Sequence, residues 1–555
     1  MGANQSYLSS ADYGYDYVLA VTQDSINAAA LAFLNSRQPV VSVCYVYDDS
    51  GDPVELGYAE LRAKAKGSDP FHLPAAGPDR DAAIGNLDDA GFMFGFQAAM
   101  GLPEGFRLDL LPPMVTFGAT GTDPVLYRLL CRTFQLVELK PVPHKTPVLQ
   151  TFAQPTGPSG QPWVFSYQVP LVHQQVADNA AFAKSAAFEN MPTQVRANVS
   201  GHPEDFTIRQ LIFEFDQAAA AVRPEIEGVD RVLRERLYED FSIKYFDQMR
   251  GSAPPVIVVT RTGGDPLAGL QTQFSINPVP STPKLATLNY LCTDAGQPLP
   301  GPKTFPWNWV EANEADAFDG VCVLNRDEFA ARLRSQVGDY VDRNKWVPIP
   351  WIKYNIAQWK AWLFVVPPDD KRAGRPDIDT LTTPETGEVL LDGHFAAFRK
   401  AADGWTKEAW VTGSTDFRIT VTCRGNQLAV EQHAAVGCEI LVPVTYHGTL
   451  NLVDLKLTDT YTLSASHDGQ LTAERTSTTQ DNAPTIPDLP VPDLKEYLQG
   501  MQQSVKGRIG SAFADLPLAI LDNVVFPGGR SFLFKAVTFS DHQDLIAHIT
   551  YAEPS

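Results

Sequence analysis

The stretch Phe417-Arg418-Ile419-Thr420-Val421-Thr422-Cys423 alternates apolar and polar side chains without a break. Strict alternation with a period of two is typical of a β-strand that buries one face and exposes the other. An Arg424-Gly425-Asn426 turn follows, and apolar alternation then continues to residue 473 through a second turn at His467-Asp468-Gly469. Because such turns join antiparallel neighbours, the pattern predicts a meander of long strands with one apolar face.

A sheet with one apolar face needs a cover, and the sequence predicts helices that could supply it. After a Pro-rich link at residues 484–492, apolar side chains recur at helical spacing over residues 494–513. Asn325, with Glu328 three positions later, is a typical helix start. The apolar stripe of that helix is Phe329, Leu333, Val337, Tyr340 and Val341. Residues 229–249 predict a further helix, and residues 532–539 and 545–551 predict closing strands.

The first half of the chain gives shorter patterns. Thr22 is expected to cap a helix, and residues 40–47 have the β-branched and aromatic content of a strand. Residues 64–90 are rich in Gly, Pro, Ala and Asp without sustained periodicity, which predicts a long surface loop. Strands are expected within residues 126–139, 163–171, 208–215, 255–260 and 285–292.

A chain of 555 residues exceeds the roughly 250 to 300 residues at which single cores stop growing. We expect three parts: residues 1–225 with an N-terminal helix and antiparallel sheet, residues 226–366 rich in helix and tryptophan, and residues 385–555 with the meander, a long helix and closing strands. The polar, Pro-rich residues 367–384 mark the clearest boundary. The predicted fold class is α+β.

Composition and charge narrow the function classes. The formal net charge of −21 repels nucleic-acid phosphates, so nucleic acid is not an expected partner. No stretch reaches the ~18 apolar residues of a membrane-spanning helix, so no integral membrane segment is expected. Residues 1–16 carry no Lys or Arg, unlike a secretory signal. We therefore expect a soluble protein that is cytoplasmic or released without a classical signal peptide.

Motifs that carry chemistry are missing. The sequence contains no G-x-G-x-x-G, Walker A, H-E-x-x-H or G-x-S-x-G pattern, and its histidines lack the i, i+4 spacing of helical metal ligands. The six cysteines show no C-x-x-C spacing and are interpreted as buried thiols, with a Cys423–Cys438 disulfide as the less favoured alternative. No catalytic residue, metal site or cofactor is predicted. An enzyme whose site assembles from distant residues stays an open alternative.

Aromatic residues gather between positions 307 and 364, where six of the nine tryptophans occur. Such rings either line an apolar site or fill the junction between sub-domains. Because an indole N–H needs a polar partner when buried, we favour a half-wet binding site. The candidate ligand-binding residues are Trp346, Trp351, Tyr354, Trp359 and Trp362.

Both ends of the chain resemble one protein family. The start Tyr15-Asp16-Tyr17-Val18-Leu19-Ala20-Val21-Thr22-Gln23-Asp24-Ser25-Ile26-Asn27 and the close at residues 525–535 and 544–551 are similar to those of the tubular lipid-binding (TULIP) fold accessory proteins. These proteins are encoded beside clostridial neurotoxins and in insecticidal toxin loci. The resemblance implies an elongated fold with long, strongly curved antiparallel sheets wrapped around long amphipathic helices. It also implies an apolar groove, and it carries over no catalytic residues.

The expected function is therefore that of a bacterial binding protein with a hydrophobic groove. Its partner would be a lipid or apolar small molecule and, through the resemblance, a protein of a toxin complex. Two alternatives stay open: an enzyme without a recognisable motif, and an assembly protein that pairs through its sheet edges.

Overall fold

The alternating stretch lies in β21 (Trp410–Arg424), within a six-stranded antiparallel sheet that we call the C-terminal sheet. Phe417, Ile419 and Val421 are buried, and Arg418 between them is exposed, as the alternation predicts. The strand order is β19-β20-β21-β22-β23-β24. The other strands of this sheet are β19 (Leu381–Thr382), β20 (Val389–Ala402), β22 (Gln427–Val442), β23 (Tyr446–Ala465) and β24 (Leu471–Asp481). The predicted meander is confirmed.

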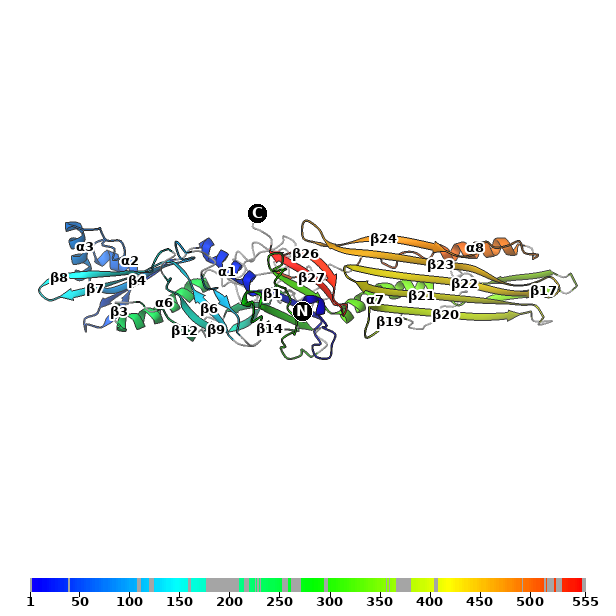
Figure 1. Cartoon of the computed structure of the whole chain (residues 1–555), viewed down its shortest axis with the longest axis horizontal. Coiled ribbons are helices and arrows are strands. Elements are labelled where there is room, and N and C mark those ends of the chain that lie inside the picture. The colour runs from blue at the N-terminus through cyan, green and yellow to red at the C-terminus, as the bar shows by residue number, and fades with distance from the viewer. Residues whose placement is uncertain are drawn as a thin grey trace.

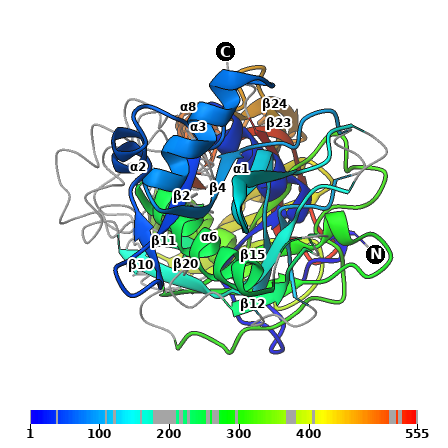
Figure 2. The ribbon, with the colours of Figure 1, turned by 90° about the vertical axis from the view of Figure 1, so that its left-hand side faces the viewer.

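The structure is a computed structural model, and Figure 1 shows an elongated molecule with the C-terminal sheet at one end. A second, central sheet lies at mid-length, and smaller sheets lie at the other end; Figure 2 views the molecule from that other end. The structure describes residues 2–37, 40–106, 111–118, 124–157, 161–175, 209–213, 219–224, 226, 229, 231–251, 258–260, 271–293, 298–355, 357–358, 360–365, 381–403, 408–491, 493–513, 516, 524–525 and 532–551.

Two helices and a hairpin cover the apolar face of the C-terminal sheet. They are α7 (Arg326–Asn344), α8 (Leu494–Lys506) and the hairpin of β17 (Pro350–Asn355) and β18 (Lys360–Val365). Leu498 and Met501 of α8 are buried in one cluster with Ile440 and Leu452 of the sheet. The Tyr497 hydroxyl donates to the Val365 carbonyl at 2.5 Å, so α8 and the hairpin are joined directly.

The central sheet collects strands from distant parts of the sequence. Its order is β14-β15-β1-β16-β27-β26, and all its pairings are antiparallel. Its strands are β1 (Tyr17–Thr22), β14 (Gln271–Asn277), β15 (Thr287–Thr293), β16 (Gly320–Leu324), β26 (Phe532–Phe539) and β27 (Leu545–Tyr551). Strand β1 pairs with β15 on one edge and β16 on the other. All of its residues are buried, because neighbours on both edges and packing on both faces remove it from water.

One buried carboxylate joins the start of the chain, α7 and the last hairpin. Asp544, which is 0% exposed, accepts hydrogen bonds from the Ser6 hydroxyl at 2.7 Å, the Leu8 amide at 2.8 Å and the Arg326 amide at 3.1 Å. Burial raises the pKa of Asp544 to about 6, and the bonds from Ser6, Leu8 and Arg326 oppose that rise. The predicted cap of α7 is also formed, since Asn325 accepts from the Asp327 amide at 2.7 Å.

Three smaller antiparallel sheets, in the orders β3-β2-β4-β7-β8, β12-β9-β6-β5 and β10-β11-β13-β25, come from the first half of the chain, except for β25 near its end. We call the second of these the cavity sheet. The strands of the first are β2 (Val40–Tyr47), β3 (Pro53–Leu56), β4 (Phe92–Met100), β7 (Cys131–Val142) and β8 (Lys145–Ala153). Those of the cavity sheet are β5 (Val115–Thr116), β6 (Val125–Leu129), β9 (Phe165–Val169) and β12 (Ala219–Val222). Those of the third are β10 (Leu171–Gln175), β11 (Arg209–Phe213), β13 (Val258–Thr260) and β25 (Val524–Val525).

Helix α6 (Arg231–Gly251) packs between the first sheet and the cavity sheet. Its Phe241 is 0% exposed, and its ring centroid lies 4.8 Å from those of Phe134 on β7 and Phe165 on β9. The remaining helices are α1 (Gln23–Arg37), α2 (Tyr58–Lys64), α3 (Pro78–Asp89) and the short 3-10 helices η1 (Ala3–Gln5) and η6 (Pro283–Leu285). The Thr22 hydroxyl accepts from the Ser25 amide at 3.2 Å, which confirms the predicted cap of α1.

The structure corrects three sequence predictions. The loop predicted at residues 64–90 contains α3, because Pro78 follows Gly77 at a helix start and Ile84 and Leu87 are buried. The run at residues 126–139 is two strands in two sheets, β6 and β7. Helix α8 ends at Lys506 rather than near residue 513, because Gly507 and Gly510 favour other conformations, although Phe513 beyond it is buried.

The cysteines are as expected. All six are buried free thiols, and Cys423 and Cys438 face Leu428 and Gly413 respectively rather than each other. Within the described residues, then, the α+β class and the antiparallel sheets agree with the sequence. Among the strands that were not predicted are β4, β8, β14, β16, β20 and both strands of the β17–β18 hairpin.

Candidate ligand-binding site

The structure divides the predicted aromatic site into two groups. Trp346 and Tyr354 are 4% and 6% exposed, and both belong to the cluster beneath the C-terminal sheet. Trp351 and Trp362 are 42% and 49% exposed. Trp359 lies outside the described residues. The four described rings, although close in sequence, therefore do not line one cavity together.

The two buried rings act as packing groups. Trp346 borders only a void of about 20 Å³ between the sheet and the ends of α7 and α8, and its carbonyl accepts from the Thr415 hydroxyl at 3.0 Å. The Tyr354 hydroxyl is buried without a hydrogen-bond partner among the described residues. A void of that size has room for about one water molecule.

The two exposed rings share the outer face of the β17–β18 hairpin. Trp351 pairs with Phe364, and Lys353 pairs with Trp362, so both indoles point to the same side. Lys353 is exposed between them. Trp351, Trp362 and Lys353 together form a surface that we call the hairpin face.

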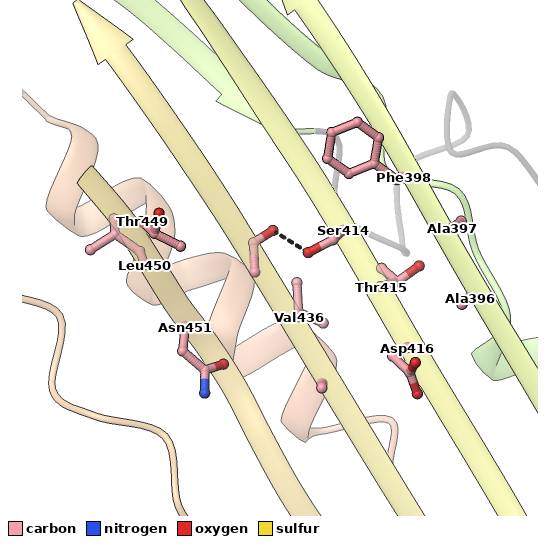
Figure 3. Close-up of a pocket in the computed structure, with 12 residues that line it drawn as sticks. Ala396, Ala397, Phe398, Ser414, Thr415, Asp416, Val436, Thr449, Leu450 and Asn451 are labelled. Atoms are coloured by element: carbon pink, nitrogen blue, oxygen red, sulfur yellow. Dashed lines mark hydrogen bonds between the residues drawn. The ribbon is translucent and has the colours of Figure 1, made fainter. Parts of the chain in front are cut away.

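A hollow of about 550 Å³ lies on the outer face of the C-terminal sheet, opposite α8 (Figure 3). Ala396, Ala435 and Gly437 line it, and their small side chains leave space between the neighbouring strands. The register of β22 against β23 shifts between Val436 and Gly437, and such a bulge bends the strand locally. Phe398, 58% exposed, stands at its rim. The hollow is broad and shallow.

A larger cavity, of about 740 Å³, lies on the outer face of the cavity sheet; we call it the N-terminal cavity. Leu126 and Arg128 of β6 alternate with the buried Val125, Tyr127 and Leu129. Their side chains therefore point away from the core and into the cavity. Arg128 faces Ser166 of β9 in the register, and Ser166 faces Val222 of β12. These outward side chains form the floor of the cavity.

Most residues in the walls of the N-terminal cavity are apolar in type, although polar atoms form nearly half of its exposed lining. The walls come from the segment before β5, from the end of β8 with the chain that follows it, and from the segments on either side of β9 and β12. The wall residues are Pro112, Phe152, Ala153, Pro155, Gln161, Pro162, Trp163, Val164, Pro224 and Ile226. Trp163 is held in place because its amide donates to Gln154 at 3.2 Å and its ring lies 5.3 Å from that of Phe134.

Arg128 is the one ionisable side chain among the described residues that line this cavity. Its Nη1 donates to the Pro113 carbonyl and to the Thr116 hydroxyl, both at 2.7 Å. Both acceptors are neutral, and no acidic side chain among the described residues pairs with the guanidinium. Burial lowers the pKa of Arg128, because a partly desolvated charge is disfavoured.

Other polar constellations are surface pairs. His394 with Asp416, His433 with Asp454 and His447 with Glu439 lie 2.8 to 3.3 Å apart on the outer face of the C-terminal sheet. Within the part of the chain that the structure describes, no three His, Cys, Asp or Glu side chains gather as metal ligands would. Nor does any described helix have the length and apolar character needed to cross a membrane.

The sequence reasoning missed the N-terminal cavity entirely. Its lining comes from several segments between residues 112 and 226, and only the tertiary structure brings these together. One local signal was available: Arg128 occupies an outward position between the buried Tyr127 and Leu129. The prolines at 112, 113, 155 and 162 also mark rigid segments beside the strands.

No protein-family model matches this chain. No curated protein matches it. Among solved structures, P47 from Clostridium botulinum A2 has a TM-score of 0.41 and 9% identity, covering 97% of each chain. P47 of Clostridium botulinum E1 has a TM-score of 0.42 and 10% identity, covering 97% of this chain and 98% of its own.

A crystal structure of lipopolysaccharide binding protein has a TM-score of 0.29 and 9% identity, covering 97% of this chain and 100% of its own. TM-scores below 0.5 carry no argument about a ligand or an activity. The resemblance stated from the two ends of the sequence is nevertheless met, since the chain is similar along nearly its whole length to structures of P47 from Clostridium botulinum.

Proposed function

We propose that this protein binds a lipid or another apolar ligand in the N-terminal cavity. The observation that supports the proposal is a cavity of about 740 Å³ whose described walls are built largely from Leu, Phe, Trp, Val, Ile and Pro side chains. Ligand pockets in proteins typically measure about 300 to 1,000 Å³ and combine apolar walls with a few polar groups. The cavity fits that class in size, and most of the residues that line it are apolar in type.

The walls are positioned by the fold rather than by the ligand. The floor consists of side chains on three hydrogen-bonded strands, β6, β9 and β12, and the opposite faces of β6 and β9 are buried in the main core. Trp163 is fixed by Gln154 and Phe134. Because these groups are ordered before binding, a ligand gains contact area without much ordering cost.

A substitution that fills the cavity should block binding. Val222 is 57% exposed at the cavity floor on the edge strand β12, so Val222→Trp places an indole in the space while the core stays untouched. We expect the affinity for dodecan-1-ol to fall at least about tenfold, which corresponds to about 1.4 kcal/mol of lost contact. Isothermal titration of the full chain measures the effect.

The matched control is Ala220→Trp. Ala220 is exposed on the same strand and does not line the cavity, so its variant should bind like the parent protein. Native mass spectrometry of gently purified protein, followed by organic extraction, tests for a copurifying lipid. Equal affinity of all three proteins for dodecan-1-ol, or no binding by any, would exclude the N-terminal cavity as the binding site.

A second candidate function is favoured by the hairpin face. Trp351 and Trp362 are half-exposed side by side with Lys353, at the far end of the C-terminal sheet from the central sheet (Figure 1). Tryptophan and lysine suit a membrane interface because each has an apolar body and a polar end. We propose that this face contacts lipid surfaces, and a toxin-complex protein is the alternative occupant.

The Trp351→Ser, Trp362→Ser double variant tests the hairpin face. Each indole would bury on the order of 100 Å² at about 25 cal/mol per Å², so binding to phosphatidylcholine vesicles should weaken at least about tenfold. Vesicle flotation measures the bound fraction. Val148→Ser, which removes another exposed apolar side chain from β8, should leave binding unchanged. Vesicle binding that survives the double substitution would remove lipid as the occupant.

A further inference from the structure

The guanidinium of Arg128 is the feature of the N-terminal cavity that the proposed function leaves unexplained. It is partly buried among lining residues that are mostly apolar in type, and a partly desolvated charge without a counter-charge is unfavourable. Its described acceptors are the Pro113 carbonyl and the Thr116 hydroxyl, and neither carries a charge. A purely apolar ligand would bury this cation further and increase the free-energy cost of its desolvation.

The two bonds to Nη1 also orient the guanidinium. Arginine presents five N–H donors in a planar fork, and Nη1 supplies two of them. The structure therefore leaves the donors on Nε and Nη2 without a protein acceptor among the described residues. Together these two nitrogens form one side of the fork, which matches the two oxygens of a carboxylate or phosphate.

We infer that the ligand of the N-terminal cavity is a single-chain amphiphile ending in an oxyanion, with that oxyanion on Arg128 and its alkyl chain against the apolar side chains of the walls. The inference rests on the proposed function and specifies the ligand class for the same site. A carboxylate and a phosphate monoester share the required chemistry.

Polar neighbours support the placement of the head group. Ser166 lies directly across from Arg128 in the β6–β9 register and lines the cavity, and Gln161 lines it as well. A hydroxyl and an amide can donate to the remaining oxygen lone pairs of an oxyanion. None of the described residues that line the cavity is an Asp or Glu that would repel the head group.

The wider charge distribution gives the site its specificity. The chain has a formal net charge of −21, so an anionic ligand is repelled at long range from most of its surface. A partly buried guanidinium that has no acidic partner among the described residues can overcome that repulsion only at short distance, where solvent screens its charge less. A cationic amphiphile would meet the like charge of Arg128 and is excluded by the same argument.

The test compares three ligands with the same alkyl chain: dodecanoic acid, dodecyl phosphate and dodecan-1-ol. For the parent protein at pH 7.5, we expect one or both anions to bind about 10- to 100-fold more tightly than the alcohol, as charge-assisted hydrogen bonds predict. Arg128→Gln should lose this preference while keeping the affinity for the alcohol. Arg128→Lys should retain part of it, because the charge remains but the planar fork is lost.

Arg132→Gln is the matched control, since it removes an arginine four residues along on β7 that does not line the cavity and lies near Glu104. It should keep the preference for anions, and the thermal unfolding midpoint of each variant reports its folding. Equal binding of anion and alcohol by the parent protein would overturn the oxyanion assignment and leave the proposed function standing. Failure of all three ligands to bind would instead contradict the proposed function. The relative affinities of the acid and the phosphate distinguish the two head groups.

Discussion

Replacement of Phe241 by alanine should lower the free energy of unfolding by about 4 kcal/mol, the middle of the range for buried phenylalanine. Phe241 is 0% exposed on α6 and lies where the first sheet and the cavity sheet meet. Its ring contacts those of Phe96, Phe134 and Phe165. Truncation leaves a cavity among rigid rings that cannot close it, so both the transfer energy and the packing energy are lost.

Urea unfolding followed by tryptophan fluorescence measures this change. Ile243→Ala on the same helix is the control, because Ile243 is 54% exposed and its loss should cost less than about 0.5 kcal/mol. Phe241→Leu, which keeps most of the volume, should fall between the two. If Phe241→Ala cost no more than Ile243→Ala, α6 would not be packed between the two sheets as described.

The second prediction concerns Asp544 and pH. Burial raises the pKa of Asp544 from 3.8 in the unfolded chain to about 6 in the fold. The folded state therefore binds the proton more tightly, and the resulting stability is fully present below pH 3.8 and is lost as pH rises through 6. The difference of about two pKa units corresponds to about 2 to 3 kcal/mol between pH 4 and pH 7.

Asp544→Asn isolates this contribution because the amide does not titrate. The unfolding free energy of the parent protein minus that of the variant should be about 2 to 3 kcal/mol larger at pH 4 than at pH 7. Other titrating groups cancel in that difference. A difference that is constant with pH, or one that grows toward pH 7, would show that the bonds from Ser6, Leu8 and Arg326 outweigh burial and hold the carboxyl ionised.

Local patterns were reliable wherever one element had a single buried face. The alternation around Phe417 predicted β21, and the stripe from Phe329 to Val341 predicted α7 with its Asn325 cap. In such elements the side-chain period and the cap chemistry are set by the residues themselves. Helix α3 was missed because its two buried residues, Ile84 and Leu87, are too few to produce a periodic signal.

The candidate site could not be found in the same way. The five aromatic residues nominated from the sequence share a short segment, but Trp346 and Tyr354 of the hairpin region face inward while Trp351 and Trp362 face outward. A hairpin sends successive residues to opposite sides, so closeness in sequence separates such rings in space. The lining of the N-terminal cavity shows the converse, since Pro112, Phe152 and Val222 meet there from distant positions.

The sequence by itself determined the antiparallel, β-rich class, the long meander, the capped helix α7 and the buried free thiols, because period, propensity and capping act over a few residues. Only the tertiary structure decided how β1, β14 to β16 and β26 to β27 combine into one central sheet, and which side chains surround a cavity. Pairing of distant strands depends on the packing of the whole chain, and no local pattern encodes the partner. The same packing leaves Arg128 among lining residues that are mostly apolar in type, without an acidic partner among the described residues, and from there the proposed ligand chemistry follows.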